Sequence, residues 1–285
     1  MSYVKKFASL VKISHTVFAM PFAFVGYFLA ARQAQEFRWE VLPLVVLCMF
    51  FARNAAMSFN RYVDRRFDAA NPRTASREVP RGVVLPSHAL LFCIVNALLF
   101  VATTFFINGL CFALSPVALA LVLGYSYTKR FTALCHFVLG LCLSVAPIGA
   151  YIAVSGAFAA PPILLSALVL LWSSGFDIIY ALPDEEFDRS QRLHSVPAAL
   201  GRKTALWLSA AVHLACGVAV LGIGIYAMNN IFYWTGASLF AVCLVYQHKI
   251  LSVKNISKVN MAFSIVNGVA GIVFALFCIA GLVAL

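Results

Sequence analysis

The sequence predicts an all-α membrane protein that crosses the bilayer several times, and three observations lead to this prediction. Hydrophobic residues make up 63% of the 285 residues and charged residues only 11%, whereas soluble domains carry about 25% charged residues. Four runs without Asp, Glu, Lys or Arg, at residues 89–128, 131–176, 204–248 and 259–285, exceed the roughly 20 residues that a spanning helix needs. The sequence also lacks the regular apolar–polar alternation that a membrane β-barrel requires.

Turn-forming pairs divide these runs into separate helices. The breaks lie at residues 108–109, 155–162 and 229–230, which contain Asn-Gly, Ser-Gly, Pro-Pro and Asn-Asn pairs typical of turns. Two further apolar segments near the N-terminus bring the expected number of spanning helices to nine. We expect these helices at residues 13–31, 41–60, 88–107, 110–128, 133–155, 162–182, 204–227, 231–248 and 260–284.

The distribution of basic residues predicts the orientation in the membrane. If the N-terminus is inside, 18 of the 21 Lys and Arg residues fall on the inner side, Arg53 lies within the second span, and only Arg32 and Arg38 fall outside. This is the positive-inside pattern, and with nine spans it predicts an N-in, C-out topology. The net charge of +11 is then explained by contact with anionic membrane lipid rather than nucleic acid. The first apolar segment has spanning length, so we expect no cleavable signal peptide, and we expect a single domain over residues 1–285.

Eight of the ten acidic residues lie on the predicted inner side, in two clusters. The first cluster follows the second predicted span and contains Asn60, Asp64 and Asp68. The second follows the sixth span and repeats the spacing with Asp184 and Asp188. Residues four apart share one face of a helix, about 6 Å apart along its axis. Each cluster therefore predicts a column of oxygen-bearing side chains.

Paired carboxylates at a membrane surface suit a hard cation. Charged groups at membrane depth cost several kcal/mol and usually serve a function. Mg²⁺ takes one or two carboxylates, keeps several waters and binds substrate phosphate. Two such columns would hold Mg²⁺ ions around a diphosphate. The alternative is that the aspartates pair with nearby arginines and form a solvated loop.

Basic and polar residues around the clusters are candidates for binding an anionic substrate. Arg73 follows the first cluster, and Lys129 and Arg130 lie in a predicted inner loop. Such residues either anchor the inner face or hold phosphate oxygens, and the sequence leaves both uses open. Arg53 lies within the second span, so it needs a partner, either Asp177 or a substrate carboxylate. His15 is expected at a similar depth.

The cysteines and histidines give no metal or disulfide signal. All eight cysteines lie in apolar segments without a C-x-x-C pair, which is typical of small buried residues. We expect His88, His136, His213 and His248 to be packing or helix-end residues.

Three segments of the sequence together form a family pattern. The first is Asn60–Asp68 with the Asn-Pro-Arg-Thr-Ala-Ser-Arg segment at 71–77, and the second is Tyr125-Ser-Tyr-Thr-Lys129. The third is the segment 175–188, which contains Asp177, Tyr180, Asp184 and Asp188. These segments resemble, in the same order, the motifs of the UbiA superfamily of intramembrane prenyltransferases, and the similarity covers nearly the whole chain.

The resemblance implies a fold, a chemistry and a set of site residues. It implies a helical bundle around a central cavity in a bacterial inner membrane, with the site facing the cytoplasm, and it implies Mg²⁺ and a polyprenyl diphosphate. By matching position, the proposed ligands of Mg²⁺ and diphosphate are Asn60, Asp64, Asp68, Asp184 and Asp188. Lys129 would contact phosphate, and Tyr125 and Tyr180 would line the site.

Within this superfamily the chain is most similar to the 4-hydroxybenzoate polyprenyltransferase branch, and closest to members assigned to menaquinone synthesis. The expected acceptor is therefore an aromatic hydroxy acid, either 4-hydroxybenzoate for ubiquinone or a dihydroxynaphthoate for menaquinone. Arg53 would hold its carboxylate, and Asp177 would orient its phenol or accept the ring proton. Haem-type or chlorophyll-type prenyl transfer is an alternative, and a membrane transporter is the alternative from another class. The sequence indicates no oligomeric state.

Two positions depart from the family pattern. Arg61 stands where many members have an aspartate, so that acid is missing here. Pro183 replaces an expected polar residue, and we expect it to kink the sixth span close to Asp184.

Overall fold

The protein is all-helical in its described residues. The computed structural model describes residues 3–11 and 19–284, and these ranges contain helices, turns and loops but no strand. The elements in chain order are α1 (Tyr3–Leu10), α2 (Met20–Ala34), α3 (Val41–Val63), α4 (Arg65–Ala70), α5 (Pro86–Ile107), α6 (Gly109–Thr128), α7 (Cys135–Ser155), α8 (Ala160–Tyr180), the 3₁₀ turn η2 (Leu182–Asp184), α9 (Glu185–Ser190), α10 (Val196–Tyr226), α11 (Ile231–Lys249), the π-helical segment η3 (Met261–Val266) and α12 (Asn267–Ala284). The all-α prediction is confirmed.

Seven helical segments in the described chain are long and apolar enough to cross a membrane. They contain α3, α5, α6, α7, α8, α10 and α12. The other two expected spans correspond to α2, with 15 described residues, and α11, with 19 residues and His248 and Lys249 in its last turn. The total of nine spans and their N-in, C-out orientation stay predictions. Most helix ends lie within three residues of the expected positions.

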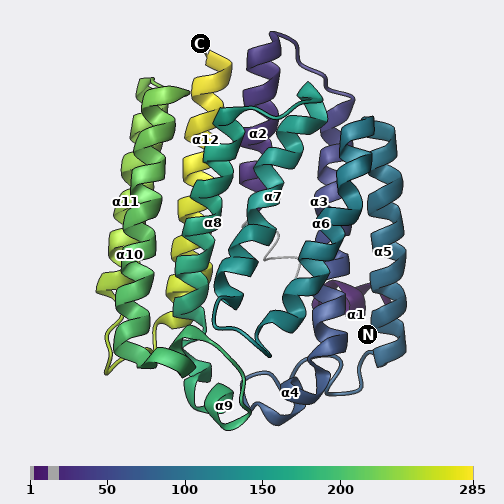
Figure 1. The fold of residues 1–285 in the computed structure, drawn as a ribbon, viewed down its shortest axis with the longest axis vertical. Coiled ribbons are helices and arrows are strands. Elements are labelled where there is room, and N and C mark those ends of the chain that lie inside the picture. The colour runs from purple at the N-terminus through teal and green to yellow at the C-terminus, as the bar shows by residue number, and fades with distance from the viewer. Residues whose placement is uncertain (1–2, 12–18, 285) are drawn as a thin grey trace.

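The long helices run side by side, and the short helices gather at one end. In Figure 1, α4 and α9 lie together at the bottom, and α1 lies towards the same end. The α6–α7 connection and the start of α10 also lie there, whereas α12 ends at the opposite end. We call the end with α4 and α9 the aspartate end, because it carries residues 60–68 and 184–188. The fold thus brings both predicted acidic clusters to one end of the bundle.

Proline, serine and glycine set the limits of several helices. Proline stands in the first turn of α5, α8 and α10, where its missing N–H costs no hydrogen bond. At the start of α10, the Ser195 side chain also accepts from the N–H of Ala198. α7 ends at Gly156, whose φ of 68° closes the helix in the left-handed region, as glycine does most easily. Gly201 has φ 77° and bends the first turns of α10.

An aromatic core joins α2, α8, α11 and α12. Trp172 of α8 is fully buried and contacts Phe22, Phe176 and Phe240. Its indole Nε1 donates to Asn267 Oδ1 at 3.1 Å, and Asn267 Nδ2 donates to the carbonyl of Ala262 at 2.8 Å. The Asn267 side chain therefore bonds a carbonyl of η3 and fixes that segment against α8. This core leaves the space between α3, α6 and α7 for a cavity.

Candidate functional site

The first acidic cluster lies at a break between α3 and α4. α3 ends at Val63. Asp64 is the C-cap of α3 and also the N-cap of α4. The N–H of Asp64 donates to the carbonyl of Asn60 at 2.9 Å, and the N–H of Asp68 donates to that of Asp64 at 2.8 Å. The i to i+4 hydrogen bonds continue through the break, so Asn60, Asp64 and Asp68 follow one another along one side of the chain.

The second acidic cluster repeats this arrangement at the end of α8. α8 ends at Tyr180, Pro183 lies in the turn η2, and α9 begins at Glu185. Pro183 thus ends the span instead of kinking it, because proline fits the first turn of a helix better than its interior. Asp184 precedes α9 as Asp64 precedes α4, and Asp188 lies within α9. Each six-residue helix carries Phe-Asp at its third and fourth positions.

Asp64 and Asp68 each bond an arginine that follows them in the chain. Asp64 Oδ1 lies 3.1 Å from Arg130 Nη2, and its Oδ2 accepts from Asn60 Nδ2 at 2.8 Å. Asp68 Oδ1 lies 2.6 Å from Arg77 Nη1. Asp68 is buried, and its Oδ2 has no hydrogen-bond partner among the described residues.

The other two aspartates connect the two clusters and the α6–α7 loop. Arg73 holds Asp184 with two guanidinium nitrogens, one of them Nε at 2.8 Å, and Asn71 Nδ2 donates to the same carboxylate at 3.0 Å. Lys129 Nζ lies 2.8 Å from Oδ1 of the fully buried Asp188. The structure thus brings Arg73, Lys129 and Arg130 to the aspartates and gives each a different carboxylate partner, and their role in binding phosphate stays a prediction.

Burial changes the acid–base properties of this end. Burial raises the pKa of the Asp64 carboxyl, although the hydrogen bond from Arg130 opposes the change. Asp64 thus loses its charge at a higher pH than an ordinary carboxyl group does. Burial alone would lower the pKa of Arg73, but the hydrogen bond and charge interaction with Asp184, together with the neighbouring Tyr180, outweigh burial and raise this pKa. Arg73 is therefore charged at every physiological pH.

The donor set fits a hard divalent cation, although cationic side chains hold the carboxylates in this structure. Among the described residues no three His, Cys, Asp or Glu side chains converge on one point. Carboxylate and amide oxygens are the ligands that Mg²⁺ prefers, and Asn60 can present its oxygen by rotating its amide. The unpaired Oδ2 of Asp68 is a buried acceptor that still needs a cation or donor. Asp188 is the poorest candidate, because it is the one fully buried carboxylate of the four and Lys129 and Ser195 contact its two oxygens.

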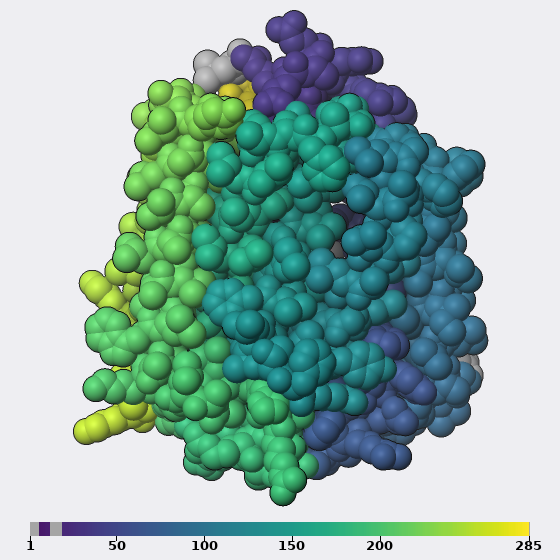
Figure 2. Space-filling view, in the orientation of Figure 1, coloured from purple at the N-terminus to yellow at the C-terminus, as the bar shows by residue number. Residues whose placement is uncertain are grey.

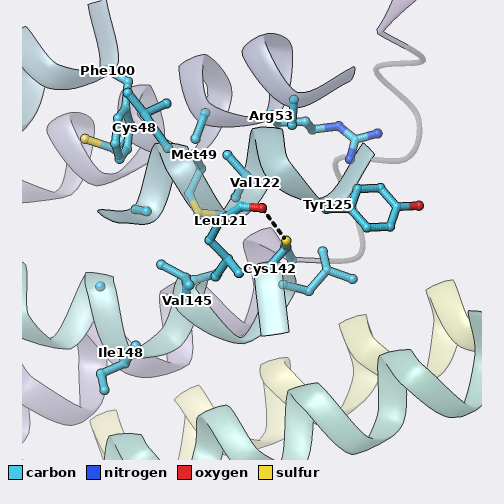
Figure 3. A pocket seen from close by; sticks show the side chains of 18 of the residues that line it. Cys48, Met49, Arg53, Phe100, Leu121, Val122, Tyr125, Cys142, Val145 and Ile148 are labelled. Carbon is cyan, nitrogen blue, oxygen red and sulfur yellow. Dashed lines mark hydrogen bonds between the residues drawn. The ribbon is translucent and has the colours of Figure 1, made fainter. Parts of the chain in front are cut away.

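A cavity of about 520 Å³ extends from the aspartate end between α3, α6 and α7. Along α3 it reaches from Arg61 to Val45, a distance of roughly 24 Å at 1.5 Å per residue. Figure 3 shows Arg53 and Tyr125 together at one side, and apolar side chains such as Val122, Val145 and Ile148 at the other. Most of the wall is apolar, so the cavity suits a long hydrocarbon group with a polar end.

The cavity also reaches the outer surface of the bundle. Val117 of α6 lines the cavity and is 65% exposed. Figure 2 shows a hollow where the surfaces of α6 and α7 meet, with deeper atoms visible through it. A hydrocarbon chain in the cavity could thus extend sideways between these helices.

Arg61, whose position departs from the family pattern, is a buried cation in the cavity wall. Its side chain is only 3% exposed, and its one hydrogen bond among the described residues is 3.4 Å long, from Nη1 to Asn60 Oδ1. Arg77 also lines the cavity there. A buried guanidinium without a carboxylate partner is costly, and binding of an anion would compensate its charge. No local pattern in the sequence indicates that Arg61 faces inwards.

Asp177 bonds a histidine instead of Arg53, the partner considered from the sequence. Its Oδ2 lies 2.7 Å from His136 Nδ1, and the carboxylate lines the cavity. His136 was expected to be a packing or helix-end residue. It lies buried at the start of α7, as expected of a helix-end residue, and it also forms this polar contact, which the sequence did not indicate. His136 and Asp177 lie 41 positions apart in the chain, so no local sequence pattern could pair them.

The two predicted tyrosines line the cavity from different helices. Tyr125 comes from α6 and Tyr180 from the end of α8. Arg73 lies over the Tyr180 ring at 4.8 Å, and Phe263 stacks on it at 4.0 Å. Tyr180 thus separates the charged aspartate end from the apolar wall. His15 lies outside the described residues.

An apolar cavity that leads to paired carboxylates and cations, inside a helical membrane bundle, defines an intramembrane enzyme for substrates with a hydrocarbon chain and an anionic head. The chain belongs to the UbiA prenyltransferase family, whose model matches residues 19–277, and it is a prenyltransferase.

Curated relatives and solved structures agree with this assignment. The chain is 33% identical over 238 residues to the 4-hydroxybenzoate octaprenyltransferase of Aliivibrio fischeri (strain MJ11), covering 83% of this chain and 82% of the relative. It is similar in structure to a UbiA homolog from Aeropyrum pernix K1, with a TM-score of 0.82, 29% identity and coverage of 95% and 98%. A UbiA homolog from Archaeoglobus fulgidus bound to GPP and Mg²⁺ has a TM-score of 0.71, 20% identity and 98% coverage of both chains, and so shares the fold.

Proposed function

We propose that this prenyltransferase moves a polyprenyl group from a polyprenyl diphosphate to the ring of an aromatic hydroxy acid in a Mg²⁺-dependent reaction. The observation that carries the proposal is the cavity, which joins a long apolar wall to Asn60, Arg61 and Arg77 at the aspartate end. An allylic diphosphate has the same division between an apolar chain and an anionic head.

The residues proposed to hold Mg²⁺ are those of the two acidic clusters. Asp64, Asp68 and Asp184 have the stronger support, with the amide oxygen of Asn60 and with Asp188 completing the set. When bound, the metal would neutralise the charge of the departing diphosphate. The Archaeoglobus fulgidus homolog bound to GPP and Mg²⁺ supports this choice of metal and donor.

Cationic side chains around the aspartates would bind the diphosphate. Arg73, Arg77, Lys129 and Arg130 each contact one of the four carboxylates, and Arg61 is a fifth cation. Four carboxylates and five cations leave a local charge of +1 before any metal binds. Diphosphate oxygens can therefore replace carboxylate oxygens as partners of these side chains, which frees the carboxylates for metal.

The reaction breaks the bond between C1 of the prenyl chain and the diphosphate oxygen, and the diphosphate leaves with the electron pair. The ring carbon next to the phenol oxygen forms the new bond to C1, and the proton on that carbon then leaves. Asp177 is the proposed group that orients the phenol or accepts this proton. Arg53 is proposed to hold the acceptor carboxylate. The apolar wall keeps water from the allylic cation.

The acceptor is proposed to be 4-hydroxybenzoate or a dihydroxynaphthoate, since both carry a phenol and a carboxylate for Asp177 and Arg53. The names of the relatives from Aliivibrio fischeri and Aeromonas hydrophila support 4-hydroxybenzoate, whereas the closest family resemblance favours the dihydroxynaphthoate. A haem-type or chlorophyll-type acceptor is the alternative within the family.

The proposed location is a bacterial inner membrane with the aspartate end in the cytoplasm. The positive-inside pattern supports nine spans in an N-in, C-out orientation. Arg61, Arg73, Arg77, Lys129 and Arg130 of the aspartate end are among the basic residues predicted on the inner side.

Removal of single carboxylates tests the proposal. We expect Asp64→Ala and Asp184→Ala to lower prenyl transfer about 100-fold or more, since each removes part of the site that neutralises the leaving group. The assay measures the prenylated acceptor formed in isolated membranes from a labelled polyprenyl diphosphate. Glu36→Ala, in the exposed α2–α3 connection, is the matched control and should keep wild-type turnover. Near-wild-type transfer by either aspartate variant would contradict the assignment.

A further inference from the structure

Asp177 is held by a histidine whose two ring nitrogens both have partners. His136 is 2% exposed and lies in the first turn of α7. Its Nδ1 lies 2.7 Å from Asp177 Oδ2, and its Nε2 lies 3.2 Å from the backbone nitrogen of Val196. The ring thus connects a carboxylate in the cavity wall with the first residue of α10.

The two partners fix the protonation of the His136 ring. The Val196 N–H can only donate, so Nε2 accepts and carries no proton. Nδ1 then carries the proton and donates it to Asp177 Oδ2, because a carboxylate accepts hydrogen bonds. The geometry therefore places a proton on Nδ1, and this proton occupies one oxygen of Asp177.

The other oxygen of Asp177 is available to a ligand. Among the described residues, Asp177 Oδ1 has no hydrogen-bond partner, and the carboxylate side chain is 16% exposed and lines the cavity. Because Oδ2 is fixed by His136, the free Oδ1 lone pairs have a defined direction. This oxygen can accept a hydrogen bond from a phenol in the cavity, or a proton from a ring carbon.

The backbone that orients His136 is itself attached to the diphosphate side of the site. Ser195 precedes Val196, and its Oγ donates to Asp188 Oδ2 at 2.7 Å. The N–H of His194 donates to the carbonyl of Lys129 at 2.7 Å. Residues 194–196 are thus fixed between the second acidic cluster and the α6–α7 loop, and they hold the Val196 N–H towards His136.

We propose that His136 is a positioning residue that fixes Asp177 for the acceptor step, with residues 194–196 as its support. The inference rests on the proposed function, in which Asp177 serves the acceptor phenol or ring proton. His136 itself contacts no substrate. Its contribution is to hold Asp177 in one orientation, as hydrogen-bonded neighbours do for ligating or catalytic groups.

Three variants of the full-length enzyme in membranes test this proposal. His136→Ala removes the donor to Asp177, and we expect kcat to fall about 10-fold to 100-fold, the range seen when such a supporting partner is removed. His136→Asn keeps a side-chain N–H near the position of Nδ1, and we expect it to restore most of the lost kcat. The KM for the labelled polyprenyl diphosphate should stay unchanged in both. The double variant His136→Ala/Asp177→Asn should be no slower than Asp177→Asn alone.

The outcomes separate this inference from the proposed function. If Asp177→Asn keeps the wild-type kcat, the role assigned to Asp177 is wrong, and the positioning role falls with it. If Asp177→Asn is slow but His136→Ala keeps the wild-type kcat, only the inference on His136 is overturned. It is also overturned if the two substitutions lower kcat by independent factors, or if His136→Asn is as slow as His136→Ala, since either result indicates a general packing role.

Discussion

Replacement of Lys129 by methionine is the substitution for which the structure gives the clearest effect on stability. Asp188 is fully buried, and Lys129 Nζ lies 2.8 Å from its Oδ1. Without Lys129, the buried carboxylate keeps only the neutral hydrogen bond from Ser195 at 2.7 Å. Removal of one partner from a buried ion pair costs about 3–5 kcal/mol. Lys129 itself is 36% exposed, so we expect the lower end, about 3 kcal/mol.

The assay is thermal unfolding of the purified protein in detergent. A loss of about 3 kcal/mol corresponds to a Tm lower by roughly 6 °C for a chain of this size. The double variant Lys129→Met/Asp188→Asn should recover most of the loss, because it removes the unpaired charge. Lys203→Met, on an exposed part of α10, controls for loss of a lysine. A Tm of Lys129→Met equal to that of wild type, or a double variant less stable than Lys129→Met, would refute the reasoning.

Two further predictions concern the cavity wall and the packing of the bundle. Arg61→Gln should weaken binding of the polyprenyl diphosphate about 10-fold to 100-fold, the value of one charge-assisted hydrogen bond, and Arg61→Lys should lose less. Equal affinity of all three proteins in a binding titration would remove Arg61 from the site. Gly26→Ala would place a Cβ 2.1 Å from the carbonyl oxygen of Pro147, so α2 and α7 must separate, at about 1–3 kcal/mol. Its Tm should fall, whereas Gly217→Ala, with no atom within 4 Å of the new Cβ, should unfold close to wild type.

The sequence predicts the spanning helices well because a bilayer imposes a simple length and polarity rule. The prediction of helix ends fails where a helix continues beyond the uncharged segment that identifies it. The expected start at residue 204 is the first position of an uncharged run, but α10 begins eight residues earlier, at Val196, and includes Arg202 and Lys203. Ser195 caps this amphipathic first part and Pro197 favours its first turn. The helices α4 and α9 have six residues each, too few to show a hydrophobic period.

The candidate site could be predicted as a set of residue types but not as a set of contacts. The spacing of Asp64 with Asp68 and of Asp184 with Asp188 is a local signal that a sequence carries. The pairing of Arg73 with Asp184 and of His136 with Asp177 joins residues 111 and 41 positions apart, which local spacing cannot indicate. The inward direction of Arg61 likewise depends on how α3 faces the cavity.

The most direct test of the account is prenyl transfer by wild-type membranes. Membranes containing the protein are incubated with a labelled polyprenyl diphosphate and either 4-hydroxybenzoate or 1,4-dihydroxy-6-naphthoate, with Mg²⁺ or with EDTA. The account predicts a ring-prenylated product from one of these acceptors with Mg²⁺, its loss with EDTA, and its recovery when excess Mg²⁺ is restored. Absence of product from both acceptors, or full turnover in EDTA, would contradict the account.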